Sequence, residues 1–357
     1  MLGSPVLLLR RLGDWSDGLQ CGHFTREIFA ELRKADVGAV TVTCGFWEGT
    51  VESLDSIARW RDLVAANKDL VAIATTVDEI EAISASGRTA IILGFQNSNL
   101  LEGRIRFVEF FAELGVRAIQ LTYNNQNELG GSCYEAEDSG LSRTGKEVVR
   151  EMNRTGILVD LSHVGNRTTK DAIIHSDKPV AVTHANPDSL FPHKRNKTDD
   201  VIRVLAEKGG VLGCATYRNI TGDHYCSSLR NWCEMVAKSV DIMGIDHVGI
   251  GTDRSHNFTK PDYDWMRMGR WTRGIDYGAA SAARPGKAPP PAWFQEVHHL
   301  GLLPGGLKEV GFNAAEVEKI TSGNWLRLYR EVFGDGQPAQ AARPGFVQSD
   351  PVLSAAS

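Results

Sequence analysis

Short apolar runs alternate with amphipathic stretches along most of this chain, and this alternation constrains the fold more than any other feature. The runs are rich in Val, Ile and Leu, and they are continuously apolar, which is typical of parallel strands buried on both faces. We predict eight strands, at Val6–Leu12, Ala39–Thr43, Ala90–Phe95, Ala118–Tyr123, Leu158–His163, Val180–His184, Val211–Tyr217 and His247–Asp253.

The stretches between these runs show helical periodicity. In Arg104–Leu114, for example, the apolar residues recur at the spacing of one helix face. We predict eight helices, at Arg26–Lys34, Ser53–Asn67, Val77–Ser86, Arg104–Leu114, Gly145–Arg154, Thr168–His175, Asp200–Lys208 and Leu229–Met243. Eight strands that alternate with eight helices predict a (β/α)8 TIM barrel, an α/β fold.

The pattern stops after the eighth predicted strand. Residues 254–300 are rich in Trp and Pro, and we interpret them as a lid-like insertion over the barrel mouth. We predict a closing helix at Ala314–Val332. Residues 335–357 are rich in Ala, Gly, Pro and Ser, and we predict that they form a disordered tail. With no internal repeat and no second core, we predict one barrel domain over residues 1–334.

Composition excludes several classes of function. The net charge of −5 gives no bulk attraction to nucleic acid or to an anionic membrane. No apolar stretch approaches the roughly 18 residues that a membrane span requires. The six cysteines form no CxxC pair and no dense framework, so we expect a reducing, cytoplasmic setting.

Residues at the carboxyl ends of the predicted strands are the candidates for chemistry, because TIM-barrel enzymes place their active sites there. These candidates are Cys21, Cys44, Gln96, Tyr123, His163, His184, Tyr217 and Asp253. His163 and His184 end adjacent strands, so their imidazoles should meet above the barrel. Histidine is the commonest metal ligand, and a catalytic zinc needs about three ligands and an open position. We therefore favour a metal site over a purely structural role for this pair.

Several segments also carry a family resemblance. They are Gly145–Asn153, Gly156–Val164, Val182–His184, Arg195–Asn196 with Asp199–Asp200, Gly249–Asp253 and Gly323–Arg327. Together they resemble the renal, or membrane, dipeptidases of peptidase family M19, over roughly residues 15 to 333. The resemblance implies a TIM barrel, a small dipeptide-like substrate, a dinuclear zinc site and, commonly, a homodimer.

The resemblance also implies roles for individual residues. His163 and His184 match two zinc ligands, and Arg195, in the motif with Asn196, matches the arginine that binds the substrate carboxylate. Asp253 matches the aspartate that passes a proton to the leaving amine. A guanidinium suits a carboxylate, and an aspartate can act as acid or base.

Four positions depart from the family pattern. Leu19 and Cys21 stand where the family has a His-x-Asp pair, Gln96 stands for a bridging glutamate, and Tyr123 stands for a histidine. Two close cations need anionic ligands, and a neutral glutamine is a poor bridge. We therefore expect at most one firmly bound zinc per chain, held by His163 and His184 and completed by Gln96, Cys21 or water.

Two of these replacements have alternative interpretations. Cys21 and Cys44 are either small buried residues or, for Cys21, a soft thiolate ligand that favours zinc. Tyr123 either supplies a hydroxyl to an oxyanion or fills the volume of the missing histidine.

Three functions follow. The first is a metal-dependent hydrolase that cuts an amide bond in a small, carboxylate-bearing substrate. The second is a repurposed enzyme with one metal or none that acts on a small amine or acid. The third is a binding protein that has lost its metals. Because His163, His184, Arg195 and Asp253 are all present, we rank the hydrolase first and the binding protein last.

Overall fold

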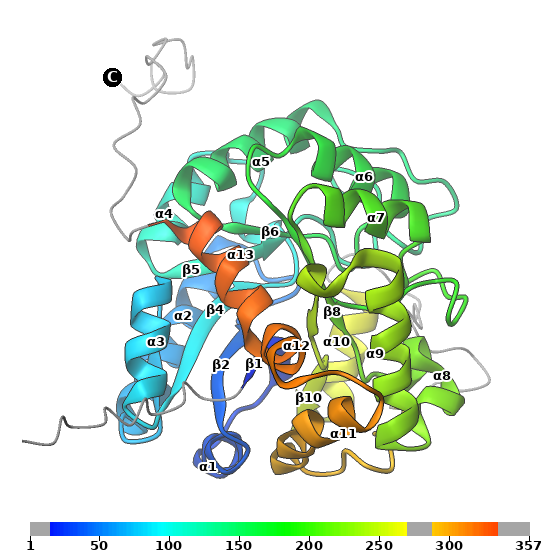
Figure 1. Ribbon diagram of the computed structural model, residues 1–357. Helices are drawn as coiled ribbons and strands as arrows, with labels where there is room; N and C mark the ends of the chain where they lie inside the picture. The colour runs from blue at the N-terminus through cyan, green and yellow to red at the C-terminus, as the bar shows by residue number, and fades with distance from the viewer. Residues whose placement is uncertain (1–14, 270–287, 335–357) are drawn as a thin grey trace, which may run out of the picture.

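Parallel strands pair side by side until the sheet closes on itself, and helices surround it (Figure 1). The computed structural model describes residues 15–269 and 288–334. Its barrel strands are β1 (Trp15–Gly22), β2 (Val37–Thr43), β4 (Thr89–Phe95), β5 (Val116–Gln120), β6 (Leu158–Asp160), β7 (Ala181–Ala185), β8 (Val211–Cys214) and β9 (Val248–Ile250). Pairing of Asp17 with Ile250 closes the ring between β1 and β9. The predicted TIM barrel is therefore confirmed.

Two short strands extend this sheet. β3 (Val71–Ile73) pairs with the first residues of β4, and β10 (Arg254–His256) pairs with Gln20–Gly22 at the end of β1. Both are parallel to their partners. β10 therefore begins directly after Asp253 and extends beyond the carboxyl end of the barrel. Asp253 is the residue for which the family resemblance implies a role in proton transfer.

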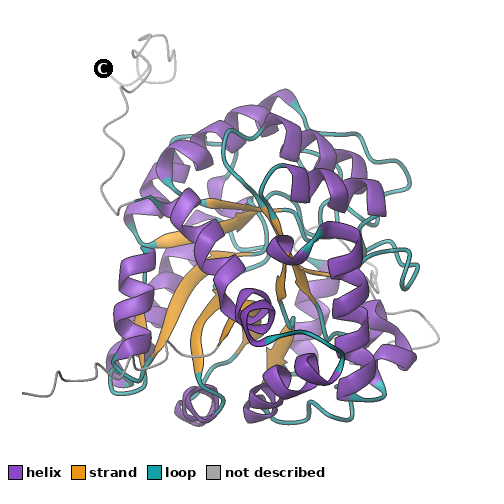
Figure 2. Cartoon of the chain, viewed as in Figure 1, coloured by secondary structure: helices purple, strands orange, loops and turns teal. Residues whose placement is uncertain are grey.

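Helices cover the outside of the barrel, as Figure 2 shows in purple around the orange strands. They are α1 (Arg26–Lys34), α2 (Thr50–Ala66), α3 (Val77–Ala85), η1 (Asn99–Leu101), α4 (Phe107–Glu113), α5 (Arg143–Thr155), α6 (Asn166–His175), α7 (Asp199–Glu207), α8 (Arg218–Cys226), α9 (Leu229–Met243), η2 (Ile245–His247), α10 (Lys260–Met268), η3 (Val297–Leu302), α11 (Leu303–Glu309), α12 (Ala314–Glu318), η4 (Lys319–Gly323) and α13 (Asn324–Phe333). Helix α5 illustrates the local signals: Ser142 caps its first turn, and Gly156 ends it in the left-handed region.

The amino-terminal end of the barrel is plugged by α13, which crosses in front of the strands in Figure 1. Trp325 is fully buried, and its Nε1 donates to the carbonyl oxygen of Ile250 at 2.9 Å. The strands make room for the indole with glycine, because a Cβ on Gly18 or Gly249 would come within 2.5 or 2.6 Å of the ring. With this end filled by packing, the opposite, carboxyl end is left for chemistry.

The structure corrects several predicted boundaries. The first barrel strand is β1, which contains Leu19 and Cys21, whereas the predicted strand Val6–Leu12 lies outside the described residues. The predicted closing helix Ala314–Val332 is divided into α12, a π-helical turn (η4) and α13. The short elements β3, β10 and α8 were not predicted, because strands of three residues and a helix kinked at Gly222 carry little periodic signal. The predicted tail at 335–357 lies outside the described residues.

Candidate active site

A cavity of about 150 Å³ opens at the carboxyl ends of the strands. Six of the predicted candidates line it, from six different strands or the loops that follow them: Cys21, Tyr123, His163, Arg195, Tyr217 and Asp253. Residues that are more than 230 positions apart in the chain thus meet in one cavity. The tertiary structure brings them together as the strand-end argument predicts.

The two predicted histidines face each other. His163 Nε2 and His184 Nε2 lie 3.2 Å apart, and both side chains are buried. The other ring nitrogen of each is also engaged, since His163 Nδ1 lies 2.6 Å from Asn124 Oδ1 and His184 Nδ1 lies 2.8 Å from Thr183 Oγ1. Burial, followed by the charge of Arg195, holds the pKa of both imidazoles well below the usual range. Both rings are therefore neutral near pH 7.

The partners of the Nδ1 atoms determine the tautomers. Asn124 Oδ1 is an acceptor, and the Thr183 hydroxyl donates to Asp160 Oδ2 at 2.7 Å, so it accepts from His184. Each Nδ1 therefore carries the proton, and the two Nε2 lone pairs point toward one another. Lone pairs at this separation repel unless a cation lies between them.

A metal ion fits this pair of donors. Zinc binds imidazole nitrogen at about 2.0–2.1 Å, so two nitrogens at a tetrahedral angle are about 3.3 Å apart, close to the 3.2 Å found here. In the described part of the chain, no group of three or more His, Cys, Asp or Glu side chains could hold a metal. The arrangement thus supplies two strong ligands, and the remaining positions fall to water, to substrate or to weaker donors.

A buried aspartate that the sequence analysis missed positions His184. Asp160 Oδ1 accepts from the backbone N–H and hydroxyl of Ser162 and from the backbone N–H of Thr183, at 2.6–3.1 Å. The hydroxyl of Ser162 in turn accepts from the backbone N–H of His184 at 3.1 Å. Asp160 therefore joins the ends of β6 and β7 and orients the second ring through Thr183, a common arrangement behind metal-binding histidines.

Asp17 joins the ends of β1 and β9, as Asp160 joins those of β6 and β7. Its carboxylate accepts from the backbone N–H of Leu19 and the side chain of Gln20, and from both the backbone N–H and the hydroxyl of Thr252. Burial raises the pKa of Asp17 to about 6. These bonds hold the strand ends immediately before Asp253. The signal for both aspartates, an acid inside or ending a buried strand, is visible in the sequence but does not name their partners.

Arg195 reaches the cavity from the loop after β7. Its two terminal nitrogens donate to the main-chain oxygens of Ser162 and His184, the latter at 2.8 Å. A guanidinium has five N–H groups, so it keeps donors for a ligand after these two bonds. The arginine is only 2% exposed. It is therefore held rigidly beside the histidines.

The neighbours of Arg195 build this loop. The Asn196 side chain accepts from the backbone N–H of Asn186 and donates to the main-chain oxygens of Phe191 and Ile220. Asn196 is not among the described residues that line the cavity. The fully buried Lys197 donates to the main-chain oxygen of Val164. The structure thus places Asn196 in the support of Arg195, and its predicted contact with substrate stays a prediction.

Asp253 follows β9 in an unusual backbone conformation. Its φ of 56° lies in the left-handed region, and its backbone N–H donates to the main-chain oxygen of Leu19 at 3.2 Å. Burial raises the pKa of its carboxyl to about 7, although the charge of Arg195 opposes this shift. A carboxyl with a pKa near neutrality can be both protonated and ionised during a reaction cycle at pH 7.

Tyr123 and Cys21 belong to an apolar cluster with Phe46 and Trp47. The tyrosine ring stacks on the imidazole of His163, with 4.2 Å between the ring centroids. Burial raises the pKa of its hydroxyl well above the usual value, so the hydroxyl stays protonated. Phe258, Trp265 and Met266, from α10 and the residues before it, pack against this cluster. Cys21 therefore lies in an apolar wall of the cavity.

Gln96 lies apart from the cavity. It is buried, its side chain donates to the hydroxyl of Thr43 at 2.8 Å, and it is not among the described residues that line the cavity. Its role as a metal ligand, like that of Cys21, stays a prediction.

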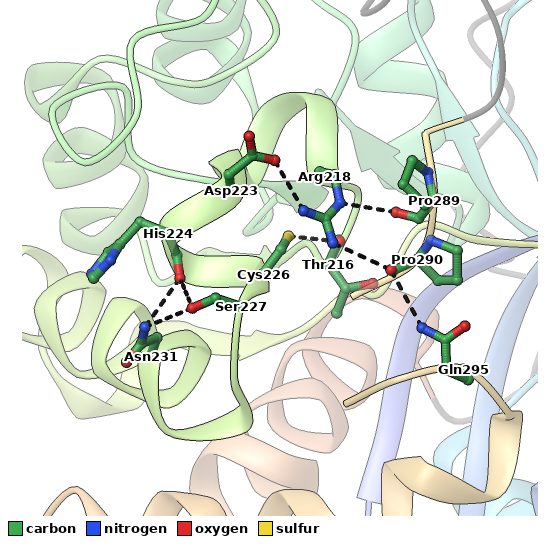
Figure 3. Close-up of polar contacts among 10 residues, drawn as sticks. All are labelled: Thr216, Arg218, Asp223, His224, Cys226, Ser227, Asn231, Pro289, Pro290 and Gln295. Carbon is green, nitrogen blue, oxygen red and sulfur yellow. Dashed lines mark hydrogen bonds and ion pairs between the residues drawn. The ribbon is translucent and has the colours of Figure 1, made fainter. Parts of the chain in front are cut away.

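The roof of the cavity comes from the segment after residue 287. Pro289, Pro290, Pro291 and Phe294 line the cavity, and Arg218 at the start of α8 holds the first two. Figure 3 shows its guanidinium between Asp223 on one side and the main-chain oxygens of Pro289 and Pro290 on the other. Within the predicted insertion 254–300, both described parts, residues 254–269 and 288–300, thus contribute residues that line the cavity.

Comparison with known proteins agrees with this geometry. The family model of the membrane dipeptidases, peptidase family M19, matches residues 25–260. Dipeptidase verJ of Clonostachys rogersoniana is 33% identical over 206 residues, which are 57% of this chain and 52% of that protein. An uncharacterized dipeptidase of Schizosaccharomyces pombe is 32% identical over 211 residues, 57% of this chain and 50% of that protein. The chain thus spans about half the length of these curated relatives.

A solved structure gives fuller coverage. An amidohydrolase from Pseudomonas aeruginosa is 33% identical and superimposes with a TM-score of 0.85, over 90% of this chain and 97% of that one. The family match covers well over half of the chain, and the fold match covers nearly all of it. The chain therefore belongs to peptidase family M19, the membrane dipeptidases.

Proposed function

We propose that this protein is a metal-dependent hydrolase that cleaves the amide bond of a small, carboxylate-bearing, dipeptide-like substrate. The observation that carries the proposal is the pair of neutral imidazoles whose Nε2 atoms lie 3.2 Å apart, one of them, His163, in a cavity that Arg195 and Asp253 also line. Membership of the membrane dipeptidase family supports the same reaction class.

We further propose one zinc ion per chain, bound by His163 and His184. When bound, such a metal lowers the pKa of a water molecule and polarises the scissile carbonyl. The family of metallopeptidases implies metal use, and the apolar cluster around Cys21 and Tyr123 disfavours a second, strongly charged ion beside the first.

The residues around the metal would divide the remaining work. Arg195 binds the substrate carboxylate with the N–H groups that its two carbonyl bonds leave over. Asp253 gives a proton to the leaving nitrogen, a role that its pKa of about 7 suits. Tyr123, protonated and stacked on His163, donates its hydroxyl hydrogen to the carbonyl oxygen as negative charge develops there.

The test combines metal counting with turnover. Purified full-length protein should contain one equivalent of zinc, and it should hydrolyse members of a panel of dipeptides and N-acyl amino acids. His163→Ala and His184→Ala should each lose the metal and the activity. Two equivalents of metal per chain would refute the single-site proposal. A zinc-loaded protein that is silent across the panel, and with Mn²⁺ and Co²⁺ as well, would refute hydrolysis.

Location and assembly remain predictions. No helix in the described residues has the length and apolarity to cross a membrane. We propose a cytoplasmic protein that forms homodimers, which cell fractionation and light scattering on the purified chain would test.

A further inference from the structure

We infer that the substrate carries a carboxylate but no ammonium group, as an N-acyl amino acid does, and that free dipeptides are disfavoured. This inference rests on the proposed amide hydrolysis and concerns the same cavity. It comes from the balance of charges on the cavity wall.

Positive charge dominates that wall. Four arginines line the cavity, Arg195, Arg218, Arg254 and Arg267, whereas Asp253 is the one acidic residue among its described lining residues. A free dipeptide carries an ammonium group close to its scissile bond. Among the described residues, the only carboxylate on the wall that could pair with that ammonium is the one proposed to protonate the leaving nitrogen.

Within residues 15–269 and 288–334, no carboxylate forms an ion pair with Arg195 or Arg254. The Arg195 guanidinium donates to the main-chain oxygens of Ser162 and His184. Arg254 Nη1 and Nη2 donate to the main-chain oxygens of Phe294 and Gln295, at 3.0 and 2.6 Å. Carbonyl oxygens carry no net charge, so these bonds leave a positive charge on each group. The carboxylate of Glu296 acts on Arg254 through space, and Arg254 Nε has no hydrogen-bond partner among the described residues. Arg218, by contrast, pairs with Asp223.

Asp253 does not restore the balance. Because burial raises the pKa of its carboxyl to about 7, the group carries only part of a negative charge at neutral pH. An ammonium in this cavity would therefore meet guanidinium groups and one partly protonated acid. Like charges held close together in a poorly solvated site disfavour binding strongly.

The rest of the wall suits a neutral acyl group. Four tyrosines, Phe294 and the three prolines of the roof supply rings and apolar surface. The buried Tyr134 hydroxyl has no hydrogen-bond partner among the described residues, so it offers a donor and an acceptor to a neutral polar ligand. Tyrosine faces also attract cations, but that attraction is weak beside several guanidinium groups. A small, uncharged acyl chain thus matches both the surface and the charge.

A pair of compounds that differ in one group tests the inference. N-propionyl-alanine is alanyl-alanine with its ammonium group replaced by hydrogen, and both are to be assayed with the zinc-loaded full-length protein at pH 7, with L- and D-alanine at the carboxyl end. We expect kcat/KM to be at least about tenfold higher for N-propionyl-alanine. Equal or faster hydrolysis of alanyl-alanine would overturn the inference while leaving the proposed hydrolase intact.

If neither compound turns over, the panel of dipeptides and N-acyl amino acids decides the proposed hydrolysis, and binding decides the inference. Calorimetric titration of the same protein then measures both ligands directly. N-propionyl-alanine that binds at least about tenfold more tightly supports the inference, and equal or tighter binding of alanyl-alanine refutes it.

A matched pair of variants tests the electrostatic cause. Arg254→Met removes a charge, whereas Arg254→Lys keeps it, and both alter the bonds to Phe294 and Gln295. The preference for N-propionyl-alanine should fall several-fold in the first variant and stay within about twofold of wild type in the second. If Arg254→Met fails to fold, Arg267→Met removes a charge from the same wall. A preference that is unchanged when the charge is removed would contradict the inference.

Discussion

Replacing Thr183 with valine should separate the positioning of His184 from the rest of the site. The substitution keeps the shape of the side chain and removes its hydroxyl, which accepts from His184 Nδ1 at 2.8 Å and donates to Asp160 Oδ2 at 2.7 Å. Without that acceptor, the neutral imidazole gains nothing by keeping its proton on Nδ1. The proton can move to Nε2, where it blocks the lone pair that faces His163.

The size of the effect follows from the bonds lost. A buried N–H left without an acceptor costs about 1–3 kcal/mol, and a lost hydrogen bond to a charged group about 1.5–3 kcal/mol. We therefore expect the metal-free protein to lose roughly 2.5–6 kcal/mol of unfolding free energy. Removing the partner behind a metal-binding histidine typically weakens metal affinity by about 10–100-fold, and we expect that range here.

The assay is zinc titration against a chelating indicator, combined with urea unfolding in the presence of EDTA. Thr41→Val is the matched control, because Thr41 is also a buried threonine and its hydroxyl meets Tyr329 Oη in the barrel interior, away from the cavity. That control should lose about 1 kcal/mol of stability and keep its zinc affinity. A Thr183→Val protein whose zinc affinity stays within twofold of wild type would refute the reasoning.

Three further predictions concern other parts of the molecule. If Asp253 acts as the acid with its pKa of about 7, kcat/KM should fall as pH rises above that value. Asp253→Asn should lower it by roughly 10²–10⁴-fold, and a flat profile from pH 6 to 9 would contradict this role. Trp325→Ala empties the plugged end of the barrel and should cost about 3–5 kcal/mol in urea unfolding; a loss below about 1 kcal/mol would show that the indole is not needed there. Arg218→Ala removes the hydrogen bonds to Pro289 and Pro290 and should raise KM several-fold with little change in kcat. The control Arg230→Ala, at an exposed ion pair on α9, should change neither constant. Equal effects of the two variants would exclude the roof as the cause.

The sequence alone was sufficient for the fold class. Long apolar runs buried on both faces and amphipathic helices between them leave few alternatives to a TIM barrel, and the predicted positions of most strands agree with the structure. The same periodicity did not locate β1, because Ser16, Asp17 and Gln20 are polar and yet buried, with hydrogen bonds that satisfy Asp17 and Gln20. It also missed α8, which is kinked at Gly222.

Some residues of the candidate site could likewise be named from the sequence, and others could not. His163 and His184 could be named from the sequence, because parallel strands present their ends at one rim and two adjacent histidines there are uncommon without a ligand. The roles of Arg195 and Asp253 came from the family resemblance. Asp160 and Thr183 could not be assigned, because a buried polar residue gives no sign in the sequence of which strand end it bonds.

The local sequence pattern thus determined which helices and strands form, because hydrophobic periodicity is a property of neighbouring residues. It also determined that the carboxyl ends of the strands lie at one rim, because the strands are parallel. Only the tertiary structure decided the state of the site. The facing Nε2 atoms, the carboxylates that tie strand ends together, and the contact of Arg218 with Pro289, 71 residues away, all depend on where distant segments meet. The charge balance of the cavity also depends on contacts between distant segments. An arginine bonded to a carbonyl oxygen keeps its positive charge, whereas one paired with a carboxylate is neutralised.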